Sequence, residues 1–180
     1  MNKKGLSTLP LLIVVVLCIG LILMFGFLVY AINQMNNVLS TGDVMAGDVN
    51  FTNASQLTFG KMTTGLNNSA NFIGGGILFA MFIGLLINAY FNRESNPKVF
   101  FIIDFIILFV AFLVSLYISN LYAEIVGISE FVNIFSTYLP SAMVFMLKLP
   151  LIVAVTGVIV MIISYAGIPM AKEEIEFSNN

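Results

Sequence analysis

Four long runs of hydrophobic residues, separated by polar segments, dominate the pattern of this chain. Each run holds about 20 residues or more, which is the length that a helix needs to cross the hydrocarbon core of a bilayer. The pattern therefore predicts an all-α fold, that of a polytopic integral membrane protein forming a single membrane domain over residues 1–180. We expect its four transmembrane helices at about residues 11–32, 72–91, 99–122 and 142–168. Prolines flank the runs at positions 10, 97, 140 and 169.

The two segments on the side opposite the termini differ in character. Residues 33–71 are rich in Asn, Gly, Ser and Thr, so we expect an outer loop with at most a small β-hairpin. Residues 123–139 carry apolar side chains at helical spacing, which predicts a short amphipathic outer helix. This interfacial helix lies either on the membrane surface or against the mouth of the bundle. Its apolar positions are Ile125, Ile128, Val132, Phe135 and Leu139.

Composition supports a membrane environment and argues against catalysis. Hydrophobic residues make up 59% of the 180 residues and charged residues only 9%, against about 25% charged in soluble domains. Histidine is absent, and the single cysteine, Cys18, lies in an apolar run where we expect it to pack as a small side chain. We find no catalytic, metal-binding or cofactor-binding motif and no basic patch for nucleic acid. We therefore expect a protein that is not an enzyme and has no cofactor.

The Lys and Arg residues predict the orientation. If all four runs cross the membrane, five of the seven cations lie on one side, and only Lys61 occupies residues 33–71. Positive residues favour the cytoplasmic side, which places both termini in the cytoplasm of a cell or in the interior of a virion. The five cations are Lys3, Lys4, Arg93, Lys98 and Lys172. Tyrosines near the ends of the runs, including Tyr122 and Tyr165, suit the membrane interfaces.

Small residues recur every four positions in two of the runs. Residues of this kind let helices approach closely in lipid. We expect the second and third runs to pack on each other as an antiparallel hairpin through these rows. The alternatives are a contact between copies of the chain or a pore lining. The first row is Gly76, Ala80, Gly84 and Asn88, and the second is Ala111, Ser115 and Ser119.

Two charged residues stand inside the apolar runs. Asp104 lies about 8 Å into the third helix, where an ionisable residue is a candidate site for ion passage or gating. We expect it near the inner boundary, beside Arg93 and Lys98, as a structural anchor or, alternatively, in a transport role. Lys148 lies near the outer boundary of the fourth helix, too far from Asp104 to pair, and extends toward the surface.

The N-terminal sequence MNKKGLSTLPLLIVVVLCIG, residues 1–20, resembles the class III leader of archaeal type IV pilin-like proteins. That resemblance implies cleavage by a prepilin-type peptidase after Gly5. The rest of the chain resembles, more weakly, small polytopic membrane proteins of viruses and mobile elements. Asn-x-Ser/Thr triplets at Asn50, Asn53 and Asn67 are acceptors only in a glycosylating secretory route.

Two functional hypotheses follow. The first is a non-enzymatic structural or assembly component of a membrane complex or a viral membrane. Its partners are the lipid bilayer and other membrane-protein subunits, including further copies of the chain. The second is a small channel, transporter subunit or holin-like permeabiliser in which Asp104 and Asn88 line a path.

Overall fold

The protein is helical along nearly all of its described length. The computed structural model describes residues 8–41, 45–46, 49–92 and 101–165. The helices are α1 (Leu9–Thr41), α2 (Phe51–Ser55), the π-helix η1 (Gln56–Gly60), α3 (Lys61–Asn92), α4 (Phe101–Val126), α5 (Ser129–Tyr138), α6 (Pro140–Leu147) and α7 (Leu149–Tyr165). Two short strands, β1 (Met45–Ala46) and β2 (Val49–Asn50), pair antiparallel between α1 and α2.

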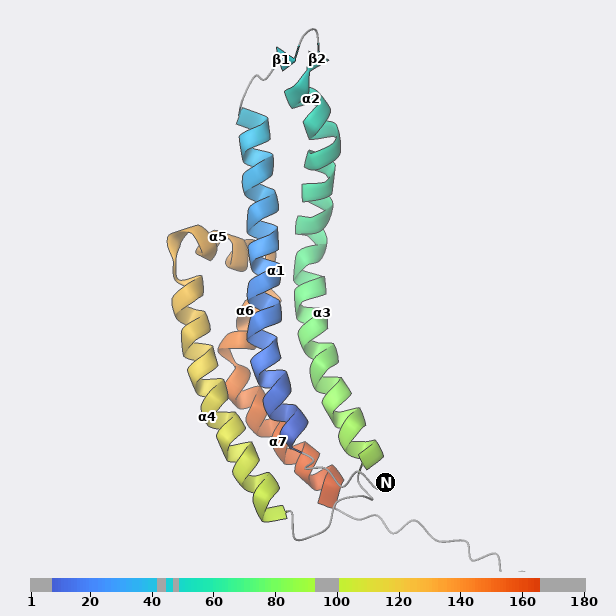
Figure 1. The fold of residues 1–180 in the computed structure, drawn as a ribbon, viewed down its shortest axis with the longest axis vertical. Helices are drawn as coiled ribbons and strands as arrows, with labels where there is room; N and C mark the ends of the chain where they lie inside the picture. The colour runs from blue at the N-terminus through green and yellow to red at the C-terminus, as the bar shows by residue number, and fades with distance from the viewer. Residues whose placement is uncertain (1–7, 42–44, 47–48, 93–100, 166–180) are drawn as a thin grey trace, which may run out of the picture.

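The long helices form an elongated bundle (Figure 1). The helix α1 packs against both α3 and α4, while α7 packs between α3 and α4. The helices α1 and α3 run side by side past the level of α5, and the β-hairpin connects them at the far end. The opposite end of the bundle holds the start of α1, the end of α3, the start of α4 and the end of α7.

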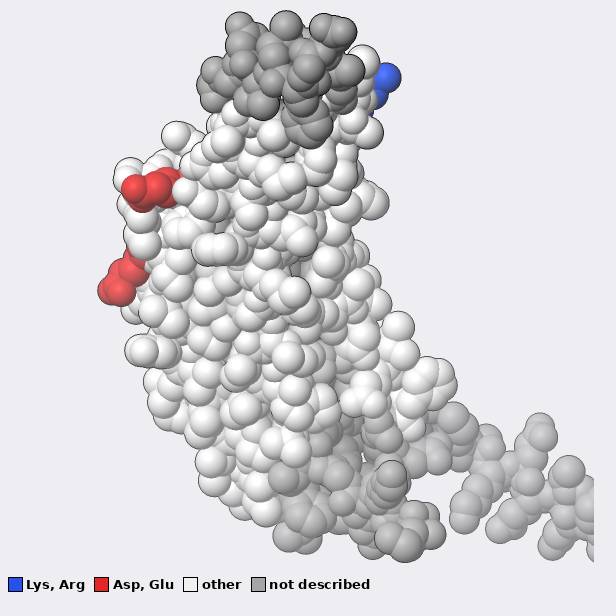
Figure 2. All heavy atoms as spheres, turned by 45° about the horizontal axis from the view of Figure 1, so that its top comes forward, with Lys and Arg blue, Asp and Glu red and all other residues white. Residues whose placement is uncertain are grey.

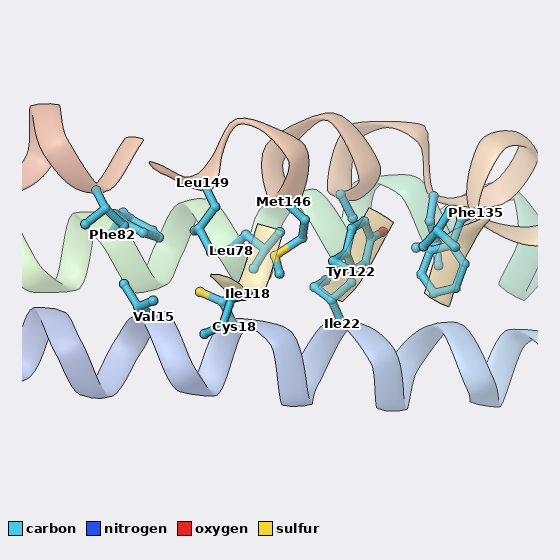
Figure 3. Close-up of a cluster of buried hydrophobic side chains, with 14 of the residues drawn as sticks. Val15, Cys18, Ile22, Leu78, Phe82, Ile118, Tyr122, Phe135, Met146 and Leu149 are labelled. Atoms are coloured by element: carbon cyan, nitrogen blue, oxygen red, sulfur yellow. The ribbon is translucent and has the colours of Figure 1, made fainter. Parts of the chain in front are cut away.

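A continuous apolar core runs along the axis of the bundle. Side chains from α1 and from α6 and α7 point toward one another in Figure 3. Cys18 is fully buried there, which confirms its expected packing role. Tyr122, which we expect near a membrane interface, is fully buried, and its ring lies 5.6 Å from the Phe135 ring, centroid to centroid. The aromatic ring supplies a large apolar area to this core.

The fourth apolar run is not one regular helix. The helices α5 and α6 meet at 107° across Leu139, and α6 begins with Pro140, whose fixed φ suits a first helical turn. A second break lies at Lys148, between α6 and α7, and Pro150 is the second residue of α7. Because proline donates no N–H and its ring disfavours helical geometry before it, a break at this position is expected.

Most of the expected outer loop 33–71 is instead helical, which corrects the sequence-based interpretation. Each side-chain amide of Asn33 and Asn67 donates to the amide oxygen of the other, and both N···O distances are 2.9 Å. The hydroxyls of Thr63 and Thr64 donate to carbonyls four residues earlier. The Asn33–Asn67 pair therefore joins α1 to α3. We call residues 33–41 and 51–70 the polar stalk.

Several helices are long and apolar enough to cross a membrane. Among the described residues, three qualify: Leu9–Ser40, Gln56–Phe91 and Phe101–Val126. The bent pair α5–α6 raises the number to four if it is taken as one span, and α7 is a shorter apolar helix. The all-helical fold and its membrane-compatible helices are therefore confirmed.

Some expectations fall outside the described residues. These are cleavage after Gly5 and the positions of Lys3, Lys4, Arg93, Lys98 and Lys172.

Candidate functional site: the Asp104 cluster

Asp104 lies at the point where three helices meet. It is in the first turn of α4 and is fully buried. Thr8, directly before α1, is also fully buried, and Tyr165 is the last residue of α7. We call these three residues the Asp104 cluster.

Hydrogen bonds join the cluster members. The backbone N–H of Thr8 donates to Oδ1 of Asp104 over 3.2 Å, and the Thr8 hydroxyl donates to the same oxygen over 2.7 Å. The Tyr165 hydroxyl donates to Oδ2. Both carboxylate oxygens therefore accept hydrogen bonds, so the cost of burying the carboxyl group is partly offset.

The local helices also suit a negative charge. The N-terminus of a helix carries a partial positive charge from its unpaired N–H groups. Asp104 lies in the first turn of α4 and faces the N-terminus of α1 through the backbone of Thr8. The carboxylate is thus close to two helix N-termini.

The ring of Tyr165 is held in place by packing. It lies 5.3 Å from the ring of Phe101, centroid to centroid, in an edge-to-face arrangement that aromatic pairs favour. Phe101 is the first residue of α4 and precedes Asp104 by one helical turn. The start of α4 therefore holds Tyr165 through both its hydroxyl group and its ring.

The small-residue row of α4 lies in a helix contact. Ala111, Ser115 and Ser119 are buried. The Ser119 hydroxyl donates to the carbonyl of Leu147 at the end of α6 over 3.1 Å. The helix contacts of α4 are mainly with α7 and α1, so the row packs on partners other than the one expected.

In the part of the chain that the structure describes, the small-residue row on α3 lies on an exposed face of the helix, which corrects the expected hairpin. Gly76, Ala80, Gly84 and Asn88 are exposed. A Cβ atom built on Gly76 or Gly84 would meet nothing within 4 Å. The opposite face of α3, which includes Leu78 and Phe82, packs on α1, α6 and α7 instead. The spacing of the small residues on α3 predicted a close helix contact. The face of α3 that is buried in the bundle carries the larger apolar side chains instead.

Close helix contacts occur at glycines that the sequence analysis did not single out for packing. A Cβ on Gly157 of α7 would lie 2.0 Å from a methyl carbon of Leu108. A Cβ on Gly26 of α1 would lie 2.2 Å from the tip of the Phe135 ring. Thr8 and Tyr165 were also missed as partners of Asp104. The signal available in the sequence was that Thr8 lies just before the first apolar run and Tyr165 near the end of the fourth, which a four-span arrangement places on the same side.

The surface of the bundle places the protein in a broad class. Large apolar side chains are exposed on all of the long helices, including Met24, Phe72, Ile102 and Leu151, which are 63–82% exposed. Figure 2 shows a largely uncharged face with acidic groups gathered at one edge. Soluble proteins rarely expose apolar patches of this extent. The fold and surface are those of a helical bundle compatible with an integral membrane protein.

Comparisons with protein-family models, curated proteins and solved structures found no match. Among the described residues, no three His, Cys, Asp or Glu side chains gather where they could hold a metal ion.

Proposed function

We propose that this chain is a non-enzymatic structural or assembly subunit of a membrane complex or a viral envelope. The observation that carries the proposal is the outer face of α3. Its row of Gly76, Ala80 and Gly84 is exposed, and nothing lies within 4 Å of a Cβ built on either glycine. A face of this shape lets another helix approach closely in lipid, where van der Waals packing drives association.

The proposal includes a membrane arrangement with four spans. The spans are α1, α3, α4 and the broken pair α6–α7. This pair extends over residues 140–165. At about 1.5 Å per residue, the 26 residues of α4 extend for about 39 Å, enough to cross a bilayer with some tilt. The 107° bend before α6 supports a position for α5 along the outer surface.

The direction of the spans follows from charge and from the Asp104 cluster. The cluster joins the start of α1 to the end of α7, so these two ends lie on the same side. The excess of Lys and Arg near this end in the sequence favours the cytoplasmic or virion-interior side for both termini. The polar stalk then projects from the opposite side.

Cysteine cross-linking in native membranes tests the assembly role. Ala80→Cys should give cross-linked products through the exposed row. Leu113→Cys, on an exposed position of α4, is the matched control and should give far fewer. A protein that remains monomeric and yields no cross-links to any other protein would contradict the proposal.

A channel or permeabiliser is the second candidate, because Asp104 is a fully buried acid within an apolar helix. Flux through reconstituted protein should then fall in Asp104→Asn and Asn88→Leu. Unchanged flux in both variants would remove these two residues from any such path.

A further inference from the structure

A groove follows one face of α6 and continues onto the start of α7. It is shallow and open to its surroundings, and its volume is about 510 Å³. We call it the Lys148 groove. It is lined by Pro140, Ser141, Val144, Phe145, Lys148 and Ile152. Four of these residues repeat at intervals of four along the two helices, so the groove is elongated along the bundle.

The neighbouring helix α3 fixes one side of this region. A Cβ built on Gly75 would lie 3.1 Å from Cβ of Ser141, so α3 passes close to the start of α6. Further along, the rings of Phe82 and Phe145 pack edge to face with centroids 5.4 Å apart. The groove wall is therefore supported by the packed core.

Lys148 places a cation in this otherwise largely apolar groove. Lys148 is exposed, and its side chain forms no hydrogen bond or ion pair with any described residue. Its backbone is occupied at the helix break: the N–H donates to the carbonyl of Val144, and its own carbonyl accepts from the N–H of Ile152.

The depth of Lys148 creates a need for a partner. This step rests on the membrane arrangement proposed above. Lys148 is eight residues from Pro140, or about 12 Å along a helix, while half of the hydrocarbon core is about 15 Å. A charged side chain at such depth is costly unless it extends to the interface or meets an opposite charge.

We propose that the Lys148 groove binds an anionic phospholipid of the outer leaflet. The lysine ammonium extends along the groove toward Ser141 and pairs with the lipid phosphate, to which the Ser141 hydroxyl also donates. One hydrocarbon chain of the lipid lies against Val144, Phe145 and Ile152. A lipid satisfies both parts of the groove, the cation and its apolar wall, whereas a carboxylate from a second copy satisfies only the cation.

The test uses the full chain in nanodiscs that contain either phosphatidylglycerol or phosphatidylcholine, with bound lipid counted by native mass spectrometry. The wild-type protein should retain phosphatidylglycerol preferentially. In Lys148→Met that retention should fall about fivefold or more, as expected for loss of a charge-assisted contact. Lys61→Met, which removes a cation of the polar stalk, should retain lipid like the wild type.

Two further variants separate lipid binding from folding. Lys148→Arg keeps the charge and should retain the lipid. Val144→Phe leaves the charge in place but fills the groove at a position that is 60% exposed, and should lower retention. Equal retention of the two lipids by the wild type, or undiminished retention in both Lys148→Met and Val144→Phe, would overturn the proposal.

Cross-linking of the Ala80→Cys protein in native membranes distinguishes this site from the proposed assembly role. Lipid retention in nanodiscs without cross-links in native membranes leaves the lipid site intact and contradicts only the assembly role. Loss of cross-links in Lys148→Met with unchanged lipid retention would assign Lys148 to a protein partner and overturn the lipid site.

Discussion

Asp104 shows how a single residue can join separate parts of a membrane bundle. The sequence marked it as a structural anchor or a transport residue, and in the structure its side chain is fully buried. The partners come from residues that lie 96 and 61 positions away in the chain. A buried carboxylate without such donors would be costly, so the cluster explains how an acid is accommodated at this position.

Substitution of Asp104 tests the contribution of the cluster to stability. Asp104→Ala leaves donors of Thr8 and Tyr165 without their acceptor, and each unpaired buried group costs about 1–3 kcal/mol. We expect the free energy of unfolding to fall by about 2–4 kcal/mol, measured by unfolding in mixed micelles. Tyr165→Phe removes one donor and should have a smaller effect, about 1 kcal/mol. An Asp104→Ala protein as stable as the wild type would refute a stabilising role.

Substitution of Tyr122 is expected to stabilise the protein, in contrast to substitution of Asp104. Its hydroxyl is buried and has no hydrogen-bond partner among the described residues, while its ring packs on Phe135. Tyr122→Phe keeps the ring and removes the unpaired group, so the free energy of unfolding should rise by about 1 kcal/mol. Thermal unfolding in detergent measures the change. A lower melting temperature would mean that the hydroxyl makes a stabilising contact.

At the scale of helices, glycines have different roles according to the face on which they lie. Gly157 of α7 is buried against Leu108 and Leu11, whereas Gly84 of α3 is exposed. The glycine content of the two runs does not distinguish these cases. Only the contacts between helices do.

Alanine at each of these glycines separates the two roles. In Gly157→Ala the new Cβ would lie 2.0 Å from Leu108 and 3.2 Å from Leu11. Overpacking of this kind costs about 1–3 kcal/mol, so the melting temperature should fall. Gly84→Ala meets nothing within 4 Å and should leave the monomer as stable as before. Equal effects of the two substitutions would contradict the assigned packing.

The polar stalk illustrates why the segment 33–71 was misjudged. Asn, Ser, Thr and Gly are weak helix formers because their side chains compete for backbone hydrogen bonds or their backbone is too free. Local propensity therefore predicted a loop. The helices persist because α1 and α3 pack on each other, with Thr63 and Ala70 buried and Asn33 paired to Asn67. The spacing of Thr63, Leu66 and Ala70, at intervals of three and four, was the helical signal available in the sequence.

At the scale of the whole molecule, the proposed topology predicts which surfaces are reachable from each side. Asn133 of α5 is exposed on the outer side of the proposed arrangement, and Phe91 of α3 is exposed near the inner end. In sealed cells, a membrane-impermeant maleimide should label Asn133→Cys but not Phe91→Cys. Detergent permeabilisation should allow labelling of both. Labelling of Phe91→Cys alone in sealed cells would reverse the orientation.

The sequence by itself determined the helical class, the approximate helices and the membrane-compatible surface, because runs of about 20 apolar residues have few other solutions. It also singled out the small-residue row of α4 and Asp104 as candidate positions. Tertiary structure decided which helices pack together, which small-residue row remains exposed and which groups bind Asp104. These features depend on how faces of distant segments fit one another, and residue spacing within one helix cannot specify the partner.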